Sequence, residues 1–206
     1  MTALTDALGG LAALGGPVVV LLLVMSVAAL AIVLGKLWEF RHLRPAERAL
    51  AEGARALRAG RDPGPAWAGG LPFAADLAPL VTARLPGPEA RQSGEARLAA
   101  RAAELAGGLR ALEAIALAAP LLGLFGTVLG MIDAFRAVEA AGATVDPADL
   151  AGGIWVALTT TAVGLAVALP VQLVLTALES RLDRAEMAAR LALDALAAPI
   201  GGGAHG

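Results

Sequence analysis

The side chains that could do chemistry within the apolar part of this sequence are hydroxyls. Thr127 lies in one uncharged run, and Thr159, Thr160 and Thr161 lie together in another. A threonine in a membrane helix usually bonds to a carbonyl of its own backbone, so one hydroxyl alone indicates only packing. Thr127 and Thr161 are stronger candidates, because two antiparallel helices would place them at similar depth. Such a pair could line a narrow polar path.

Titratable groups are missing from these uncharged runs. Proton transport through a membrane normally requires an ionisable side chain that holds the ion partway across. If this chain forms a channel, a partner must therefore supply that group. The two histidines, His42 and His205, lie at opposite ends of the chain, and there is no cysteine. This leaves almost no material for a metal site or a nucleophile–base pair, so we expect no cofactor and no enzyme activity.

Three uncharged runs account for much of the hydrophobic content, which is 58% of 206 residues. They cover residues 7–35, 114–132 and 150–178, and a helix of roughly 20 residues crosses the hydrocarbon core. The first run has no basic segment before it and no clear cleavage site after it, so we interpret it as a retained anchor. The sequence therefore predicts an all-α integral membrane protein with three transmembrane helices.

Basic residues indicate the orientation of these spans. Residues 1–35 contain no Lys or Arg, residues 36–113 contain twelve of the sixteen, and three arginines follow the third span. The positive-inside rule then places the N-terminus outside and the long loop and C-terminal tail in the cytoplasm. A net charge of −2 gives no reason to expect nucleic-acid binding. The predicted divisions are an N-terminal segment with the first span (1–36), a cytoplasmic helical loop (37–113), the second span (114–136), a periplasmic loop (137–149), the third span (150–178) and a cytoplasmic C-terminal helix and tail (179–206).

The cytoplasmic segments also carry helical patterns. A Pro/Gly-rich stretch at 62–72 and the prolines at 86 and 88 interrupt them. From Ser93 the pattern continues into the second span, and a helix unbroken to about Val138 would be about 70 Å long and extend well into the cytoplasm. The third span is expected to begin with Asp146 as N-cap and Pro147 at the first helical position, and to continue into the charged C-terminal segment.

Small residues follow one face of the second and third spans, at the spacing that lets helix backbones approach closely in lipid. They are Gly123, Gly126 and Gly130 in the second span, and Gly153, Ala157, Thr161, Thr160, Gly164 and Ala168 in the third. These faces could pack the helices of one subunit, and their presence on two helices favours an oligomer as well. Pro120 and Pro170 each free a carbonyl within a span and can produce a kink or a hydrated spot.

Two segments resemble the signatures of one membrane-protein family. Residues 119–135 (APLLGLFGTVLGMIDAF) closely resemble the second-span signature of the MotA/TolQ/ExbB proton channel family, and residues 153–170 (GIWVALTTTAVGLAVALP) resemble its third. The resemblance covers residues 93–190. It is nearer to ExbB and TolQ than to MotA, which has four spans.

The resemblance implies a homopentameric ring in the bacterial inner membrane, which surrounds the membrane helices of an ExbD/TolR-like partner dimer. In that family the partner contributes an Asp that takes up and releases protons, and proton flow drives work in the periplasm or outer membrane, where a TonB/TolA-like protein is a further expected partner. Thr127 and Thr161 align with the family's pore threonines, and Pro170 aligns with its third-span proline. Many ExbB and TolQ members carry Glu where this chain has Val156.

Val156 leaves more than one hypothesis open. The partner's Asp could suffice, with Thr159, Thr160 and Thr161 as the polar lining of the path. Alternatively, the chain could conduct poorly, couple to another ion, or serve as a non-conducting scaffold with the family fold. A membrane enzyme is disfavoured by the lack of catalytic groups. Outer-membrane uptake and envelope maintenance remain equally compatible with the sequence.

Overall fold

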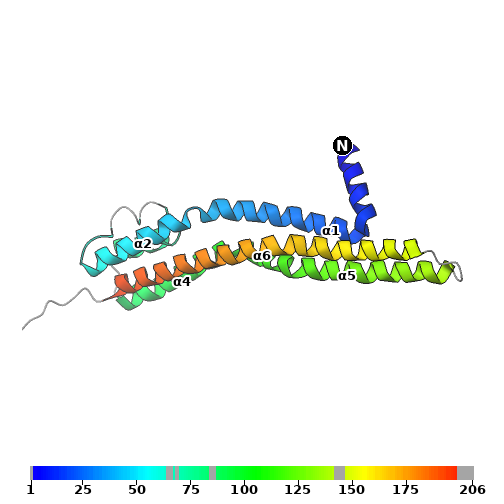
Figure 1. Ribbon diagram of the computed structural model, residues 1–206. Helices are drawn as coiled ribbons and strands as arrows, with labels where there is room; N and C mark the ends of the chain where they lie inside the picture. Colours follow the sequence, from blue (N-terminus) through cyan, green and yellow to red (C-terminus); the bar gives the residue numbers. More distant parts are fainter. Residues whose placement is uncertain (1, 64–66, 68–69, 84–86, 142–146, 199–206) are drawn as a thin grey trace, which may run out of the picture. The chain divides into compact units, whose positions relative to one another are not determined.

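The computed structural model describes residues 2–63, 67, 70–83, 87–141 and 147–198. Within these ranges the regular structure is entirely α-helical, as predicted (Figure 1). The helices are α1 (Thr2–Phe40), α2 (Leu43–Arg58), α3 (Ala74–Ala83), α4 (Gly87–Ala106), α5 (Leu109–Ala141) and α6 (Pro147–Ala197). The Pro/Gly-rich stretch separates α2 from α3, as the sequence indicated, because proline and glycine are the poorest helix formers.

Three stretches are long and apolar enough to cross a membrane: Gly16–Arg58, Leu109–Ala140 and Leu150–Ala197. Each overlaps one of the predicted spans, so the number and order of the long apolar helices are as expected. The points at which the bilayer begins and ends along these helices, and with them the predicted divisions of the chain, stay predictions.

The chain divides into two compact units that we describe separately. The first comprises residues 1–34 and 110–175, and the second comprises residues 35–109 and 176–206. In the first unit, Leu22 of α1 is fully buried and packs with Ala119 of α5 and Ala168 of α6. In this interior, small residues of α5 and α6 therefore lie against a large side chain of α1.

Large apolar side chains of the first unit point outward instead. On α5, Leu121 is 65% exposed and Phe125 is 54% exposed, and on α6 Leu169 is 63% exposed. A protein in water rarely leaves so many large apolar residues uncovered on adjoining helices. Lipid tails satisfy such a surface, which agrees with an integral membrane protein.

The second unit has an interior of larger residues. Trp67 is buried, and its indole Nε1 donates a hydrogen bond of 3.0 Å to the carbonyl oxygen of Ala49 on α2. The ring lies against Gly53, where it leaves no room for a Cβ. Glycine at this position lets the aromatic side chain sit directly on the α2 backbone.

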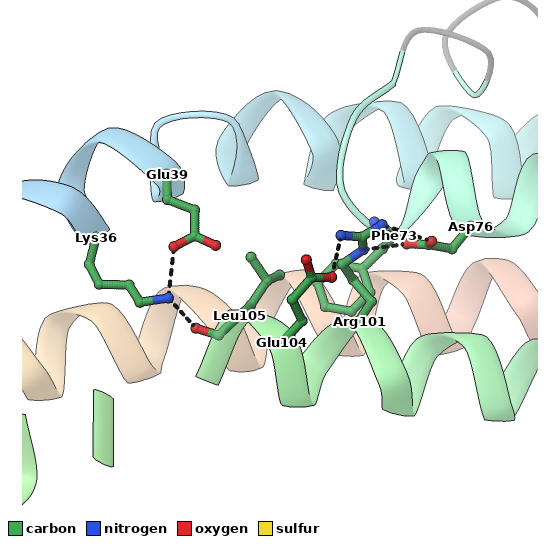
Figure 2. Close-up of polar contacts among 7 residues, drawn as sticks. All are labelled: Lys36, Glu39, Phe73, Asp76, Arg101, Glu104 and Leu105. Carbon is green, nitrogen blue, oxygen red and sulfur yellow. Dashed lines mark hydrogen bonds and ion pairs between the residues drawn. The ribbon is translucent and has the colours of Figure 1, made fainter. Parts of the chain in front are cut away.

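An ion-pair cluster joins α3 to α4 in the same unit (Figure 2). The Arg101 guanidinium contacts both carboxylate oxygens of Asp76, at 2.9 and 3.2 Å, and reaches Glu104 at 2.6 Å. Asp76 also accepts a hydrogen bond from the backbone N–H of Phe73 at 3.2 Å. The hydrogen bond to Asp76 raises the pKa of Arg101 above its ordinary value, so this guanidinium remains charged throughout the physiological range.

The predicted continuous helix from Ser93 to Val138 is wrong. Helix α4 starts earlier, at Gly87, and ends at Ala106, and α5 begins at Leu109. Two consecutive glycines separate them, and Gly108 has a φ of +82°, a left-handed conformation that glycine adopts without steric cost. The helical pattern continues on both sides of the Gly–Gly pair, so the pattern did not show that this pair ends α4.

The side chain of Lys36 lies at the C-terminal end of α4. Its ammonium group is buried and donates to the carbonyl oxygen of Leu105 at 3.0 Å and to Glu39 at 2.7 Å (Figure 2). The last carbonyls of a helix lack N–H partners and carry partial negative charge, so a cation is favoured there. Lys36 therefore caps α4, a role that charge counting along the sequence did not reveal.

The third long helix begins at Pro147, as predicted. The expected N-cap, Asp146, lies outside the described residues. Helix α6 then continues without interruption to Ala197, so the predicted continuation of the third span into the charged C-terminal segment is confirmed.

Candidate functional site

The candidate site lies along the seam between α5 and α6, where the two backbones approach closely. A Cβ placed on Gly123 would lie 3.0 Å from the carbonyl oxygen of Thr160, and one on Gly164 would lie 2.6 Å from the carbonyl oxygen of Ala119. Carbon–oxygen contacts are normally about 3.3–3.6 Å, so a side chain at Gly164 would force the backbone to shift, and one at Gly123 would require it to give by a few tenths of an ångström. The close approach expected from the small-residue spacing is therefore present within one chain.

The seam has a regular antiparallel register. Gly130 faces Ala157, and Gly153 faces Ala134, so the partner number on α6 falls as the residue number on α5 rises. Gly126 lies between these positions, opposite Thr160. All five glycines that the sequence singled out for packing belong to this seam.

Thr160 links the two helices at the centre of the seam. It is 1% exposed, and its Oγ1 lies 2.7 Å from the carbonyl oxygen of Ala157 and 3.2 Å from that of Gly123, across the seam. Gly126 makes room for it, because a Cβ there would lie 2.6 Å from the same hydroxyl oxygen. Thr160 is one of the threonines predicted to line a polar path, and in the structure its hydroxyl lies between the two helices.

Thr127 and Thr159 have local partners. Thr127 donates to the carbonyl oxygen of Leu124 at 2.6 Å, and Thr159 donates to that of Trp155 at 2.8 Å. These bonds back to the preceding turn are the usual arrangement for threonine in a membrane helix. Each hydroxyl proton therefore already has an acceptor, and each hydroxyl oxygen can still accept a hydrogen bond from another donor.

Thr161 differs from Thr127, Thr159 and Thr160 in the hydrogen bonding of its hydroxyl. Its hydroxyl oxygen is buried and has no hydrogen-bond partner among the described residues. Leaving a buried hydroxyl without a partner costs about 1–3 kcal/mol, so such groups are rare and call for a specific explanation. A molecule the size of water does not reach this oxygen, so an outside group could bond to it only after the side chain rotates about χ1.

Thr127 and Thr161 lie at nearly the same level of the antiparallel pair. The register that places Gly126 opposite Thr160 and Gly123 opposite Gly164 puts Thr161 one to two residues from the level of Thr127. One residue of helix rises about 1.5 Å, so the two positions lie within about 3 Å of the same level.

The two threonines also share one flank of the helix pair. Leu122, Leu129 and Val163 pack against the cluster that contains α1, and so mark the flank on which α1 lies. At 3.6 residues per turn, Thr127 and Thr161 are each rotated from the seam toward the opposite flank. This flank is the one that the chain's own first helix leaves uncovered.

Pro120 and Pro170 lie inside α5 and α6. Each removes the N–H that would bond to the carbonyl four residues earlier, which leaves a polar group within an apolar helix. Val156 precedes Val163 by two helical turns and therefore shares its face, which is directed toward the α1 flank. A carboxylate in place of Val156 would thus not lie on the flank of Thr161.

This arrangement can donate and accept hydrogen bonds but cannot titrate. The runs 114–132 and 150–178 contain no ionisable side chain. Among the described residues, no group of three or more His, Asp or Glu could hold a metal ion. Hydroxyls and freed carbonyls in such a setting can orient water or an incoming polar side chain.

Comparison with known proteins agrees with the signatures. A model of the MotA/TolQ/ExbB proton channel family matches residues 73–190, more than half of the chain. The chain belongs to this family. It is therefore a multi-pass membrane protein of a transport-associated family, and the two signature segments fall on the two helices that form the seam.

Individual relatives are of the ExbB type. The chain is 51% identical over 63 residues to the biopolymer transport protein exbB1 of Vibrio cholerae, covering 31% of this chain and 28% of that protein. It is 46% identical over 76 residues to a putative ExbB homolog of Methanothermobacter thermautotrophicus, covering 37% and 26%. It is 41% identical over 107 residues to a putative ExbB-like protein of Synechocystis, covering 50% and 42%. The chain thus matches less than half the length of each relative.

Proposed function

We propose that this chain is the channel subunit of a proton-driven motor in the bacterial inner membrane, with its N-terminus periplasmic and its C-terminus cytoplasmic. The observation that carries the proposal is the uncovered flank of the seam, where Thr127 and the unpartnered Thr161 lie at one level in a member of a proton channel family. Rotation of the Thr161 side chain about χ1 would bring its buried hydroxyl to this flank, where a polar group from another molecule would satisfy it.

The group that titrates comes from a partner in this proposal. An ExbD/TolR-like dimer would place its membrane Asp beside the two threonines, because the spans themselves contain no acid. A ring of five copies would enclose that dimer. A proton that crosses a potential of 100 mV releases about 2.3 kcal/mol, so several protons would drive one sizeable mechanical step.

In this proposal the proton flow drives work in the periplasm or at the outer membrane, outside the ring of subunits. Relatives are named biopolymer transport proteins, which supports a role in energising transport through a TonB/TolA-like protein that spans the periplasm. Envelope maintenance of the TolQ kind uses the same machinery and is the other role compatible with this chain.

Reconstitution tests the proposal directly. The chain is co-purified with an ExbD/TolR-like single-span protein from the same organism, placed in vesicles with an internal pH dye, and given a membrane potential. We expect proton influx that needs both proteins and stops when the partner's membrane Asp is changed to Asn. Subunit counting by native mass spectrometry should give five copies of this chain with two of the partner.

Two neighbouring threonines provide a matched pair of variants. Thr161→Val keeps the side-chain shape but removes the hydroxyl, and we expect partner-dependent flux to fall about tenfold, which corresponds to the loss of one hydrogen bond of about 1.4 kcal/mol. Thr159→Val removes a hydroxyl that already bonds to the carbonyl of Trp155, and flux should remain near wild type. Equal flux in both variants would remove Thr161 from the pathway.

Val156 supports one alternative, a scaffold that assembles without conducting. The same vesicles decide between the two functions. An intact complex of five and two subunits that gives no partner-dependent flux of protons or sodium ions would establish the scaffold.

A further inference from the structure

The segment that follows the first span carries an exposed pair of residues that the motor proposal does not use. Trp38 is 68% exposed, and the guanidinium carbon of Arg41 lies 4.5 Å from the centre of its ring. Leu37, beside them, is 42% exposed. These residues form one surface in which an apolar side chain, an indole and a cation adjoin.

The guanidinium of Arg41 is held in place with its donors available. Its Nε donates to Nε2 of His42 at 2.9 Å, which together with the stacking on Trp38 fixes the plane of the group. Within the described residues Arg41 has no carboxylate partner, so the two Nη groups present a preformed fork. Such a fork suits two oxygens of a phosphate.

Lys36, the basic residue that precedes Arg41 in the sequence, already has partners for its charge. Lys36 is buried, and its ammonium group is bonded to Glu39 and to the carbonyl oxygen of Leu105. It is therefore not available to an external anion. Arg41 is the first basic residue after the uncharged run that remains open to one.

Helix length places the pair at the edge of the bilayer. The uncharged run ends at Gly35, and α1 continues to Phe40 without a break. Trp38 lies about 5 Å and Arg41 about 9 Å further along the chain, at 1.5 Å per residue. The headgroup layer is about 5–8 Å thick on each side of the hydrocarbon. With the end of the hydrocarbon taken at Gly35, Trp38 lies within this layer and Arg41 at its outer edge, from which its long side chain can reach the lipid phosphates. Tryptophan is favoured at this level.

We propose that Trp38, Arg41 and His42 form a binding site for the phosphate of an anionic phospholipid. The indole and Leu37 would contact the upper acyl chain and glycerol, and the guanidinium would bind the phosphate. Arg44, exposed one turn further on and without an ion pair among the described residues, raises the local positive potential and favours a headgroup with net negative charge. This site stands independently of ion conduction.

Arg58 is too far away to take part. It is exposed in the last turn of α2, 15 residues after Leu43, which is about 23 Å along that helix. That distance exceeds the Debye length of about 8 Å in physiological salt. Arg58 therefore serves as a control, since its removal changes net charge equally without affecting the site.

Native mass spectrometry of the complex in nanodiscs tests the proposal. The membranes contain equal amounts of phosphatidylglycerol and phosphatidylcholine, and the lipid retained by the released complex is counted. In wild type we expect phosphatidylglycerol to be retained preferentially. Each basic residue near an anionic surface contributes enough to change retention about fivefold, so Arg41→Gln should lower it by that factor. Trp38→Leu removes the ring on which the Arg41 guanidinium stacks, and it should lower retention as well. Arg58→Gln should leave it unchanged.

Three results would overturn the site. Equal loss in Arg41→Gln and Arg58→Gln would mean diffuse charge attraction. Equal retention of the two lipids by wild type would mean that the surface has no preference for an anionic headgroup. A change in subunit number in Arg41→Gln, read from the same spectra, would mean that this surface joins two copies of the chain.

Discussion

Adding a single methyl group at Gly164 tests the seam on which the candidate site depends. In Gly164→Ala the new Cβ would lie 2.6 Å from the carbonyl oxygen of Ala119 and 3.1 Å from Cα of Gly123. The first distance is about 0.7 Å shorter than an ordinary carbon–oxygen contact. Both neighbours are backbone atoms, so neither can rotate away and the helices must separate.

The expected free-energy change combines two opposing effects. Overpacking of this kind typically costs about 1–3 kcal/mol, whereas replacing glycine by alanine within a helix returns up to about 1 kcal/mol. We expect a net loss of about 1–2 kcal/mol in the free energy of unfolding. For a chain of this size, that lowers the melting temperature by about 2–8 °C.

Thermal unfolding in detergent, followed by circular dichroism, measures this shift. Gly152→Ala, on the same helix, is the matched control, because nothing lies within 4 Å of a Cβ placed there. We expect this control to melt at or slightly above the wild-type temperature. If Gly164→Ala melts as high as the control, the close approach of α5 and α6 is refuted, and with it the placement of Thr161.

Two further predictions concern the second unit. Lys36→Met removes the cation that caps α4 at Leu105 while keeping an unbranched side chain. Hydrogen exchange of the amides at 105–109 should increase about tenfold, as expected for the loss of about 1.4 kcal/mol. Unchanged exchange would mean that the Gly–Gly pair alone ends the helix. Trp67→Phe deletes the hydrogen bond to Ala49 and should lower the free energy of unfolding by about 1–2 kcal/mol. Trp155→Phe, at a site 66% exposed, is the control, and an equal effect of both changes would contradict the assigned role of Trp67.

The sequence alone determined the features that depend on local composition. A bilayer requires about 20 apolar residues for each crossing, so the three runs could be counted directly, and the family signatures could be recognised in the second and third of them. The absence of an acid within these runs is likewise a property of the sequence, and it leads to the proposed partner. Glycine spacing indicated which faces of the two helices would pack.

Only the tertiary structure decided how those faces meet. Neighbouring residues on a helix differ by 100° in direction, so the sequence could not tell which of Thr159, Thr160 and Thr161 would enter the seam. The register with Gly123 and Gly126 gives that position to Thr160 and leaves the hydroxyl of Thr161 buried without a partner. The sequence also could not show that Lys36 caps α4, because this contact joins residues 69 positions apart. Contacts between distant segments arise from packing, and no local pattern encodes them.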